Sequence, residues 1–278
     1  MTSGRIVTTP AQLRAAMGGQ PVGLVPTMGA LHEGHLSLIR QSARDNPLTV
    51  VSVFVNPTQF GSATDLAAYP RVLESDAARA FTVGADIIYA PAAEIVYPPG
   101  FSTTVTVAAL TDRWEGASRP GHFAGVATVV AILLNTVRPA RSYFGEKDFQ
   151  QLAVIRRMHA DLLLPGEIIG RPTVRDRDGL ALSSRNARLS PDERAAAAAI
   201  PQALYTMRDA ADAGETDSGR LVARGRMIID AQPLLTLDYL AIVDEQTLEP
   251  LGVLRSGSRA LVAVVARDTR LIDNLAIA

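Results

Sequence analysis

The chain has 278 residues, 47% of them hydrophobic, which is enough for one large domain or two smaller ones. Its 27 basic and 28 acidic residues nearly cancel, and since they form no basic tract we expect no nucleic-acid partner. The absence of cysteine excludes thiol nucleophiles, disulfides and cysteine metal sites and fits a cytoplasmic location, and no apolar stretch reaches the roughly 20 residues of a membrane span.

The first two-thirds of the chain alternate short β-branched runs with helical patterns. In chain order they predict a strand at Val22–Pro26, a helix at Gly34–Arg44, a strand at Thr49–Val55, a helix at Glu74–Val83, a strand at Asp86–Tyr89, a helix at Phe123–Val137, a strand at Arg141–Phe144, a helix at Asp148–Leu162 and a strand at Ile168–Gly170. Such alternation predicts an α/β domain over residues 1–173, with a mostly parallel sheet covered on both faces.

The pattern changes after about Thr173. A helix is expected to start at Ser190, where serine is a favourable N-cap and is followed by proline and, three residues on, by glutamate. Pro201 should break or restart that helix. A further helix and three strands follow, at Ser218–Asp230, Asp238–Val243, Arg259–Ala266 and Leu271–Ile277. Helices followed by strands predict a smaller α+β domain over residues 174–278.

Polar clusters follow three of the predicted parallel strands, at residues 27–35, 56–60 and 145–151. In open parallel sheets, ligands bind beyond the carboxyl ends of the strands. We therefore expect the three clusters to lie at the same edge of the sheet and to form the functional site.

The first cluster contains two histidines, His32 and His35, at the start of a predicted helix. A spacing of three places both side chains on one face, and Gly34 between them allows a base or ribose to approach the backbone. Free N–H groups and the helix dipole favour a phosphate there, to which both imidazoles could donate. A zinc-binding pair and ordinary surface histidines are the alternatives.

Lys147 is the only lysine of the chain; every other basic side chain apart from histidine is arginine. A compact ammonium can reach a single phosphate oxygen where a planar guanidinium does not fit. The retained lysine therefore indicates a phosphate contact, although a chance survivor on the surface would look the same in isolation.

Six ordered segments resemble the pantothenate synthetase family, part of the His-x-Gly-His nucleotidyltransferase superfamily: Pro26–His35, Phe54–Phe60, Tyr69–Arg71, Glu115–Phe123, Phe144–Gln151 and Asp178–Asn186. The resemblance covers essentially the whole chain, with residues 62–64 as a weak spot. It implies a Rossmann-like nucleotidyltransferase domain, with a smaller α+β domain that closes over it. It also implies a ligase that condenses pantoate with β-alanine through pantoyl adenylate and releases AMP and pyrophosphate, in pantothenate and coenzyme A biosynthesis.

The resemblance also implies roles for individual residues. It makes His35, His32, Lys147 and Arg185 catalytic, and it assigns pantoate to Gln59, Gln151 and Asn56. Neutral amides suit pantoate because they donate and accept without neutralising the attacking carboxylate. The residues that it assigns to ATP are Met28, Gly29, Ala30, Leu31, His32, Glu33, Gly34, His35, Gly145, Glu146, Lys147, Asp148, Val174, Leu182, Ser183, Ser184 and Arg185.

Several roles stay open at this level. The two glutamines and residues 182–185 could be solvated surface, Asp76 could orient nucleotide or magnesium or lie on a helix surface, and Arg119 and His122 could contact substrate or cap a helix. Mg²⁺ is expected to accompany ATP, held mainly by phosphate oxygens and water. A homodimer is a family-based expectation. Two rival functions are a nucleotidyltransferase that stops at a nucleotide-linked product and a non-catalytic ATP sensor.

Overall fold

The computed structural model describes residues 4–278, which form two compact units. The first contains residues 4–145 and 150–171, and the second contains Glu146–Phe149 and Pro172–Ala278. An α/β unit with a parallel sheet and a smaller α+β unit confirm the predicted fold class. The short segment Glu146–Phe149 belongs with the second unit although its chain neighbours on both sides belong to the first. The domain boundary near residue 173 stays a prediction.

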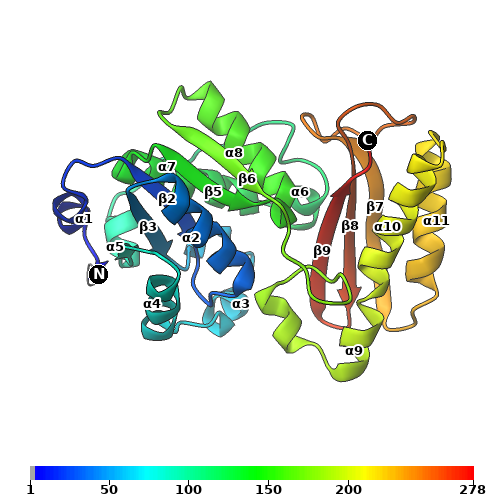
Figure 1. Cartoon of the computed structure of the whole chain (residues 1–278), viewed down its shortest axis with the longest axis horizontal. Helices are drawn as coiled ribbons and strands as arrows, with labels where there is room; N and C mark the ends of the chain where they lie inside the picture. Colours follow the sequence, from blue (N-terminus) through cyan, green and yellow to red (C-terminus); the bar gives the residue numbers. More distant parts are fainter. Residues whose placement is uncertain (1–3) are drawn as a thin grey trace. The chain divides into compact units, whose positions relative to one another are not determined.

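The first unit is built on a six-stranded parallel sheet in the order β1-β4-β3-β2-β5-β6. Figure 1 labels β3, β2, β5 and β6 of this sheet. The strands are β1 (Arg5–Val7), β2 (Val22–Thr27), β3 (Leu48–Val53), β4 (Ile87–Tyr89), β5 (Arg141–Gly145) and β6 (Glu167–Arg171). The chain runs outward from β2 through β3 to β4 and then returns to β5 on the other side of β2. The switch point of this topology therefore lies between β2 and β5, where ligands of open parallel sheets bind.

Helices cover this sheet on both faces. Val25, Val51 and Ile88 form one core with α2 and α4, whereas their neighbours Leu24 and Val50 are also fully buried and alternate to the opposite face. Strands buried on both faces explain why β2 and β3 are apolar runs. The helices are α1 (Pro10–Met17), α2 (Glu33–Asp45), α3 (Ala63–Ala68), α4 (Leu73–Thr82), α5 (Ala93–Val96), α6 (Glu115–Ser118), α7 (His122–Val137) and α8 (Phe149–Asp161), with short 3₁₀ turns η1 (Pro57–Gln59) and η2 (Glu146–Asp148).

The second unit packs two helices against an antiparallel sheet of order β7-β8-β9. Leu204 and Met207 of one helix and Leu221 of the next share a core with Val262 and Val264 of the central strand. Its elements are a 3₁₀ turn η3 (Ser184–Arg188), α9 (Pro191–Ala196), α10 (Ala199–Asp212), α11 (Ser218–Asp230), β7 (Leu235–Asp244), β8 (Ser258–Ala266) and β9 (Thr269–Ala276). The predicted capping by Ser190 and the helix restart near Pro201 are confirmed.

The structure adds elements that the pattern did not indicate. Strand β1 has three residues and pairs only with β4, too short for a periodic signal. Helix α1 begins after Thr9, whose hydroxyl accepts from the Gln12 N–H in a capping box. Within residues 4–278 no helix has the length and apolarity to cross a membrane.

Candidate active site

Both histidines of the first cluster hold the start of α2. The Nδ1 atom of His32 accepts from the Gly34 N–H at 3.2 Å, and the Nδ1 atom of His35 accepts from the His32 N–H at 3.3 Å. The two imidazoles thus form a capping box, with ring centroids 4.1 Å apart. Because each Nδ1 accepts, each neutral ring carries its proton on Nε2. At the start of α2, the Nδ1 atom of each ring therefore accepts a capping bond, and the proton of each neutral ring lies on Nε2.

Gly34 has a local reason to be glycine. A Cβ at this position would lie 2.9 Å from Cε1 and from Nδ1 of His32, closer than real Cβ contacts. The missing side chain thus lets the His32 ring fold back over the backbone to make its cap. This explanation differs from the predicted one, in which the glycine admits a base or ribose.

Helix α4 fastens the loop that precedes these histidines. Asp76 is only 2% exposed, and its two carboxylate oxygens accept from the N–H groups of Ala30 and Leu31, each at 2.8 Å. One turn later, Arg79 donates to the Leu31 carbonyl at 2.5 Å. Ala30 needs this support because its φ of 51° lies in the left-handed region. Asp76 is therefore a buried loop anchor rather than a helix-surface aspartate.

These contacts occupy part of the predicted phosphate site. The sequence predicts free N–H groups for phosphate at this helix start, but those of Ala30, Leu31, His32 and Gly34 each donate to a side chain of the protein. A buried carboxylate is the strongest of these acceptors. The imidazole rings are further candidate donors to an anion at this helix start.

We expect Asp76→Asn to loosen the loop. An amide can accept from one of the two N–H groups but turns its own NH₂ toward the other, which should lower the free energy of unfolding by about 1–3 kcal/mol and raise the KM for ATP. Urea unfolding and initial rates measure both effects. The exposed Glu74→Gln on the same helix is the matched control. Unchanged stability together with an unchanged KM would contradict the role given to Asp76.

Asn56 and Gln59 form a buried amide pair after β3. The Asn56 Nδ2 donates to the Gln59 Oε1 at 3.0 Å and to the Gly125 carbonyl at 3.1 Å, while its Oδ1 accepts from the Tyr97 hydroxyl at 2.7 Å. Because Gln59 Oε1 accepts, its Nε2 points the other way, 3.1 Å from the Met28 sulfur. Asn56 therefore orients Gln59, and the Gln59 NH₂ lies beside the first predicted cluster.

The N-terminus of α7 holds the main chain of Gln59. The His122 Nδ1 lies 2.9 Å from the Gln59 carbonyl, and its Nε2 lies 3.2 Å from an Arg119 nitrogen that can only donate. His122 is thus neutral with its proton on Nδ1, and it donates to Gln59. A Cβ on Gly125 would lie 2.5 Å from the Thr58 carbonyl oxygen, so the close approach of α7 to η1 requires glycine there. The contacts of His122 and Arg119 thus hold the main chain of Gln59 at this helix entry.

The neighbouring glutamines Gln150 and Gln151 differ in their surroundings. Gln150 is 5% exposed and donates to the carbonyls of Leu110 and Arg113, both at 2.8 Å, while it accepts from the Glu115 N–H at 3.0 Å. It is a structural residue. Gln151, on the first turn of α8, is half-buried.

A cavity of about 440 Å³ adjoins the first and second clusters. It is lined by main chain and side chains that follow β2, β3 and β4 and by α4, including Met28, Gly29, Phe54, Asp76 and Pro91. The anchored loop and the carboxyl ends of three parallel strands thus border one open space within the first unit.

In the second unit the structure brings Lys147 together with residues of the segment 182–185. Lys147, Ser183 and Arg185 line a small cavity of about 10 Å³, which Asp273 also borders. The Lys147 side chain is 15% exposed, with its Nζ 3.5 Å from an Asp148 carboxylate oxygen. Ser183 caps η3 by accepting from the Arg185 N–H at 3.2 Å. Three predicted ATP residues, from two distant segments of the sequence, therefore line the same cavity.

A charged turn precedes this segment. Arg194 of α9 contacts the carboxylates of Asp178 and, at 2.9 Å, Asp176. Its hydrogen bond lowers the pKa of Asp178. The turn closes where the Leu182 N–H donates to the Val174 carbonyl at 3.0 Å. The turn that leads to Leu182–Arg185 is thus held by Arg194 and by the bond between Leu182 and Val174.

The side chains of two predicted ATP residues are engaged within the protein. Leu31 is a core residue, 2% exposed. The Glu33 carboxylate forms an ion pair with Arg40, and this contact lowers the pKa of Glu33.

Among the described residues, no group of three or more histidine and acidic side chains lies together in a way that could hold a metal ion.

Comparisons with known proteins agree with one another. The sequence model described as pantoate-beta-alanine ligase matches residues 5–276. A pantothenate synthetase from Thermus thermophilus is 53% identical over 274 residues, 98% of this chain and 99% of its own. A crystal structure of pantothenate synthetase from the same organism, 51% identical, superposes with a TM-score of 0.95 over 98% of this chain and 99% of that one. The pantoate-beta-alanine ligase of Francisella tularensis, complexed with beta-gamma ATP and beta-alanine, is 31% identical with a TM-score of 0.80 over 99% and 98%.

Proposed function

The chain belongs to the pantoate–β-alanine ligase family and is an ATP-dependent ligase of these two substrates, and we propose that it works through pantoyl adenylate. The pantoate carboxylate attacks the α-phosphate of ATP and pyrophosphate leaves. The amine of β-alanine then attacks the acyl carbon, and AMP leaves as the amide forms. No covalent nucleophile is required, so positioning and charge stabilisation carry the reaction.

The observation that carries this proposal is the fixed tautomer of the paired histidines. Both rings offer an Nε2–H donor from a helix start, and charge develops on the phosphate oxygens as pyrophosphate departs. Because each Nδ1 is held by the backbone, the donors need no reorganisation during the reaction. We assign His35, with His32 beside it, to the stabilisation of the phosphates.

Lys147 and Arg185 are proposed to serve the same ATP molecule. An ammonium and a guanidinium fork are complementary to the phosphate charge, and Ser183 and Ser184 add hydroxyl donors. The remaining ATP residues named above are proposed to contact the nucleotide largely through their main chain. Mg²⁺ would be held by phosphate oxygens and water and would neutralise part of their charge.

Gln59 and Gln151 are proposed to bind pantoate. The bond from Asn56 to Gln59 Oε1 turns the Gln59 NH₂ toward Met28, where it can donate to the carboxylate or hydroxyl of pantoate. Asn56 then contributes by orienting Gln59. A homodimer and a cytoplasmic location stay predictions that rest on the resemblance and on the composition.

An isotope experiment tests the intermediate. With pantoate labelled by ¹⁸O in its carboxylate, one labelled oxygen should appear in AMP, because the acyl C–O bond breaks when the amine attacks. Mass spectrometry of AMP after complete turnover measures this transfer, and a reaction without β-alanine is the control, which should release pyrophosphate without free AMP. Unlabelled AMP would eliminate the pantoyl adenylate.

A second test concerns the glutamines. Gln59→Ala and Gln151→Ala should each raise the KM for pantoate far more than the KM for ATP, because a polar ligand loses its partner in a desolvated pocket. Initial-rate kinetics with either substrate varied gives the comparison, and the exposed Gln202→Ala on α10 serves as control. Equal losses for ATP and pantoate would show that the glutamines belong to another part of the pocket.

A further inference from the structure

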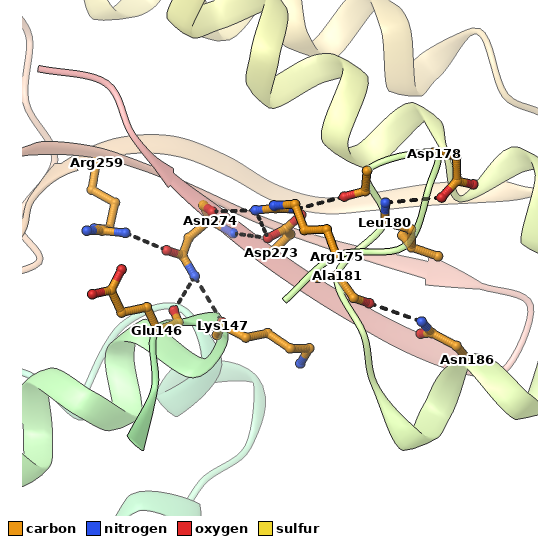
Figure 2. Close-up of polar contacts among 11 residues, drawn as sticks. Glu146, Lys147, Arg175, Asp178, Leu180, Ala181, Asn186, Arg259, Asp273 and Asn274 are labelled. Carbon is orange, nitrogen blue, oxygen red and sulfur yellow. Dashed lines mark hydrogen bonds and ion pairs between the residues drawn. The ribbon is translucent and has the colours of Figure 1, made fainter. Parts of the chain in front are cut away.

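The segment that carries the only lysine is held by one side chain of β9. The Nδ2 atom of Asn274 donates to the carbonyl of Glu146 at 2.8 Å and to the carbonyl of Lys147 at 2.9 Å (Figure 2). Asn274 is 4% exposed, so both bonds are shielded from water. They join positions that are more than 120 residues apart in the sequence. The backbone at Lys147 is thus fixed from the C-terminal sheet.

The orientation of this amide is determined by its partners. The Asn274 Oδ1 accepts from Arg259 Nη1 at 2.7 Å, and arginine can only donate, just as the two carbonyls can only accept. The β8–β9 register pairs Leu261 with Asn274, which places Arg259 two residues along on the same face. A flipped amide would lose all three bonds.

Arg259 secures the other end of the same segment. Its guanidinium carbon lies 3.8 Å from the centre of the Phe149 ring, a close cation–π contact. Phe149 is 5% exposed, and Arg259 is 9% exposed. Glu146–Phe149 is therefore held at its start by Asn274 and at its end by Arg259.

The residue before Asn274 holds the second phosphate segment. Asp273 receives two hydrogen bonds from Arg175, at 2.6 and 2.9 Å, and Arg175 also donates to the Asn274 carbonyl at 3.2 Å and to the Gly179 carbonyl at 3.0 Å (Figure 2). From this turn the chain leads to Ser183 and Arg185. Two adjacent residues of β9 thus fix both segments whose side chains line the small cavity.

We propose that Asn274 is a positioning residue for Lys147. It sets the backbone from which the ammonium reaches phosphate, so that Lys147 and Arg185 keep their mutual placement. The proposal rests on the function proposed for Lys147 above. Asn274 itself does not need to touch ATP, because its amide is committed to two carbonyls and one guanidinium.

Kinetic coupling tests the proposal. Asn274→Ala should lower kcat/KM for ATP by roughly 10- to 100-fold, the scale of misplacing a reacting group, with the KM for pantoate nearly unchanged. In a Lys147→Ala background the same change should cost little more, since its effect acts through the lysine. Equal losses in both backgrounds would overturn the proposal. Leu221→Val, at a fully buried position of the same unit, controls for lost stability without contact to the segment.

Lysine reactivity gives a readout that does not depend on activity. Without ligands, an amine-acylating reagent should modify Lys147 several-fold faster in Asn274→Ala than in the wild type, while the N-terminal amine reacts equally and serves as internal standard. Peptide mass spectrometry measures both sites. Unchanged reactivity would overturn the positioning role, whatever the kinetics. Raised reactivity, combined with normal turnover of Lys147→Ala, would instead overturn the function proposed for the lysine.

Discussion

Replacement of His35 by alanine is expected to lower turnover by roughly 100-fold or more, the scale of losing one transition-state donor. The ring is held by the bond from the His32 N–H to its Nδ1, and in the proposed role its Nε2–H donates as the pyrophosphate departs. Turnover under saturating substrates, with circular dichroism to confirm folding, measures the effect.

The structure allows the two ring nitrogens to be tested separately. In His35→Asn the side-chain oxygen can still accept from the His32 N–H, but nothing replaces Nε2, so activity should remain low. In His35→Gln the amide reaches toward the Nε2 position and should recover part of the rate. His159→Ala, on α8, is a matched histidine control. Near-normal turnover of His35→Asn would show that His35 only caps α2 and does not donate to the phosphates.

Changing Lys147 should have a comparable effect. Lys147→Ala removes the ammonium, and Lys147→Arg should also be poor because a planar guanidinium does not present the compact donor that a single phosphate oxygen needs. We expect losses on the order of 100-fold in kcat/KM for ATP in both variants. Kinetics with ATP varied is the measurement.

Chemical modification provides an independent check of Lys147. As the only lysine, it is one of two amines that an acylating reagent can reach, the other being the N-terminus. Activity should fall in step with modification at Lys147, and Mg-ATP should slow the loss. If turnover stayed intact after full acylation of Lys147, or if Lys147→Arg were fully active, Lys147 would be an ordinary surface residue without a role in ATP binding. Arg40→Lys places a second lysine on the exposed face of α2. Acylation of that lysine should not lower activity, which makes this variant the control.

The sequence was most informative where local pattern and topology agree. Apolar runs predicted β2 and β3 because strands of a parallel sheet are buried on both faces. The apolar helix α7 was predicted at Phe123–Val137, and the structure adds His122 at its start. The family motifs identified the ligase, since six ordered segments leave little freedom for another function.

Long-range contacts account for what the sequence did not reveal. Asp76 lies 45 or more positions from the backbone that it holds, and Gly125 is fixed by the carbonyl of Thr58, far earlier in the chain. No spacing rule connects such pairs. The imidazole capping box was equally hidden, because capping rules describe serine, threonine, aspartate and asparagine. The capping box before α1 was visible in Thr9 and Gln12 and could have been found.

The insertion of Glu146–Phe149 into the second unit has a consequence for dissecting this protein. A fragment cut at residue 172 would contain the three-stranded sheet and its helices but would lack these four residues. The Asn274 amide would then lose its two carbonyl acceptors, and the Arg259 guanidinium would lose its cation–π contact with the Phe149 ring. Polar groups that are buried in the whole chain would be left without partners in the fragment. We therefore do not expect the fragment 172–278 to fold stably by itself, and the segment 146–149 would have to be restored by circular permutation or through a linker.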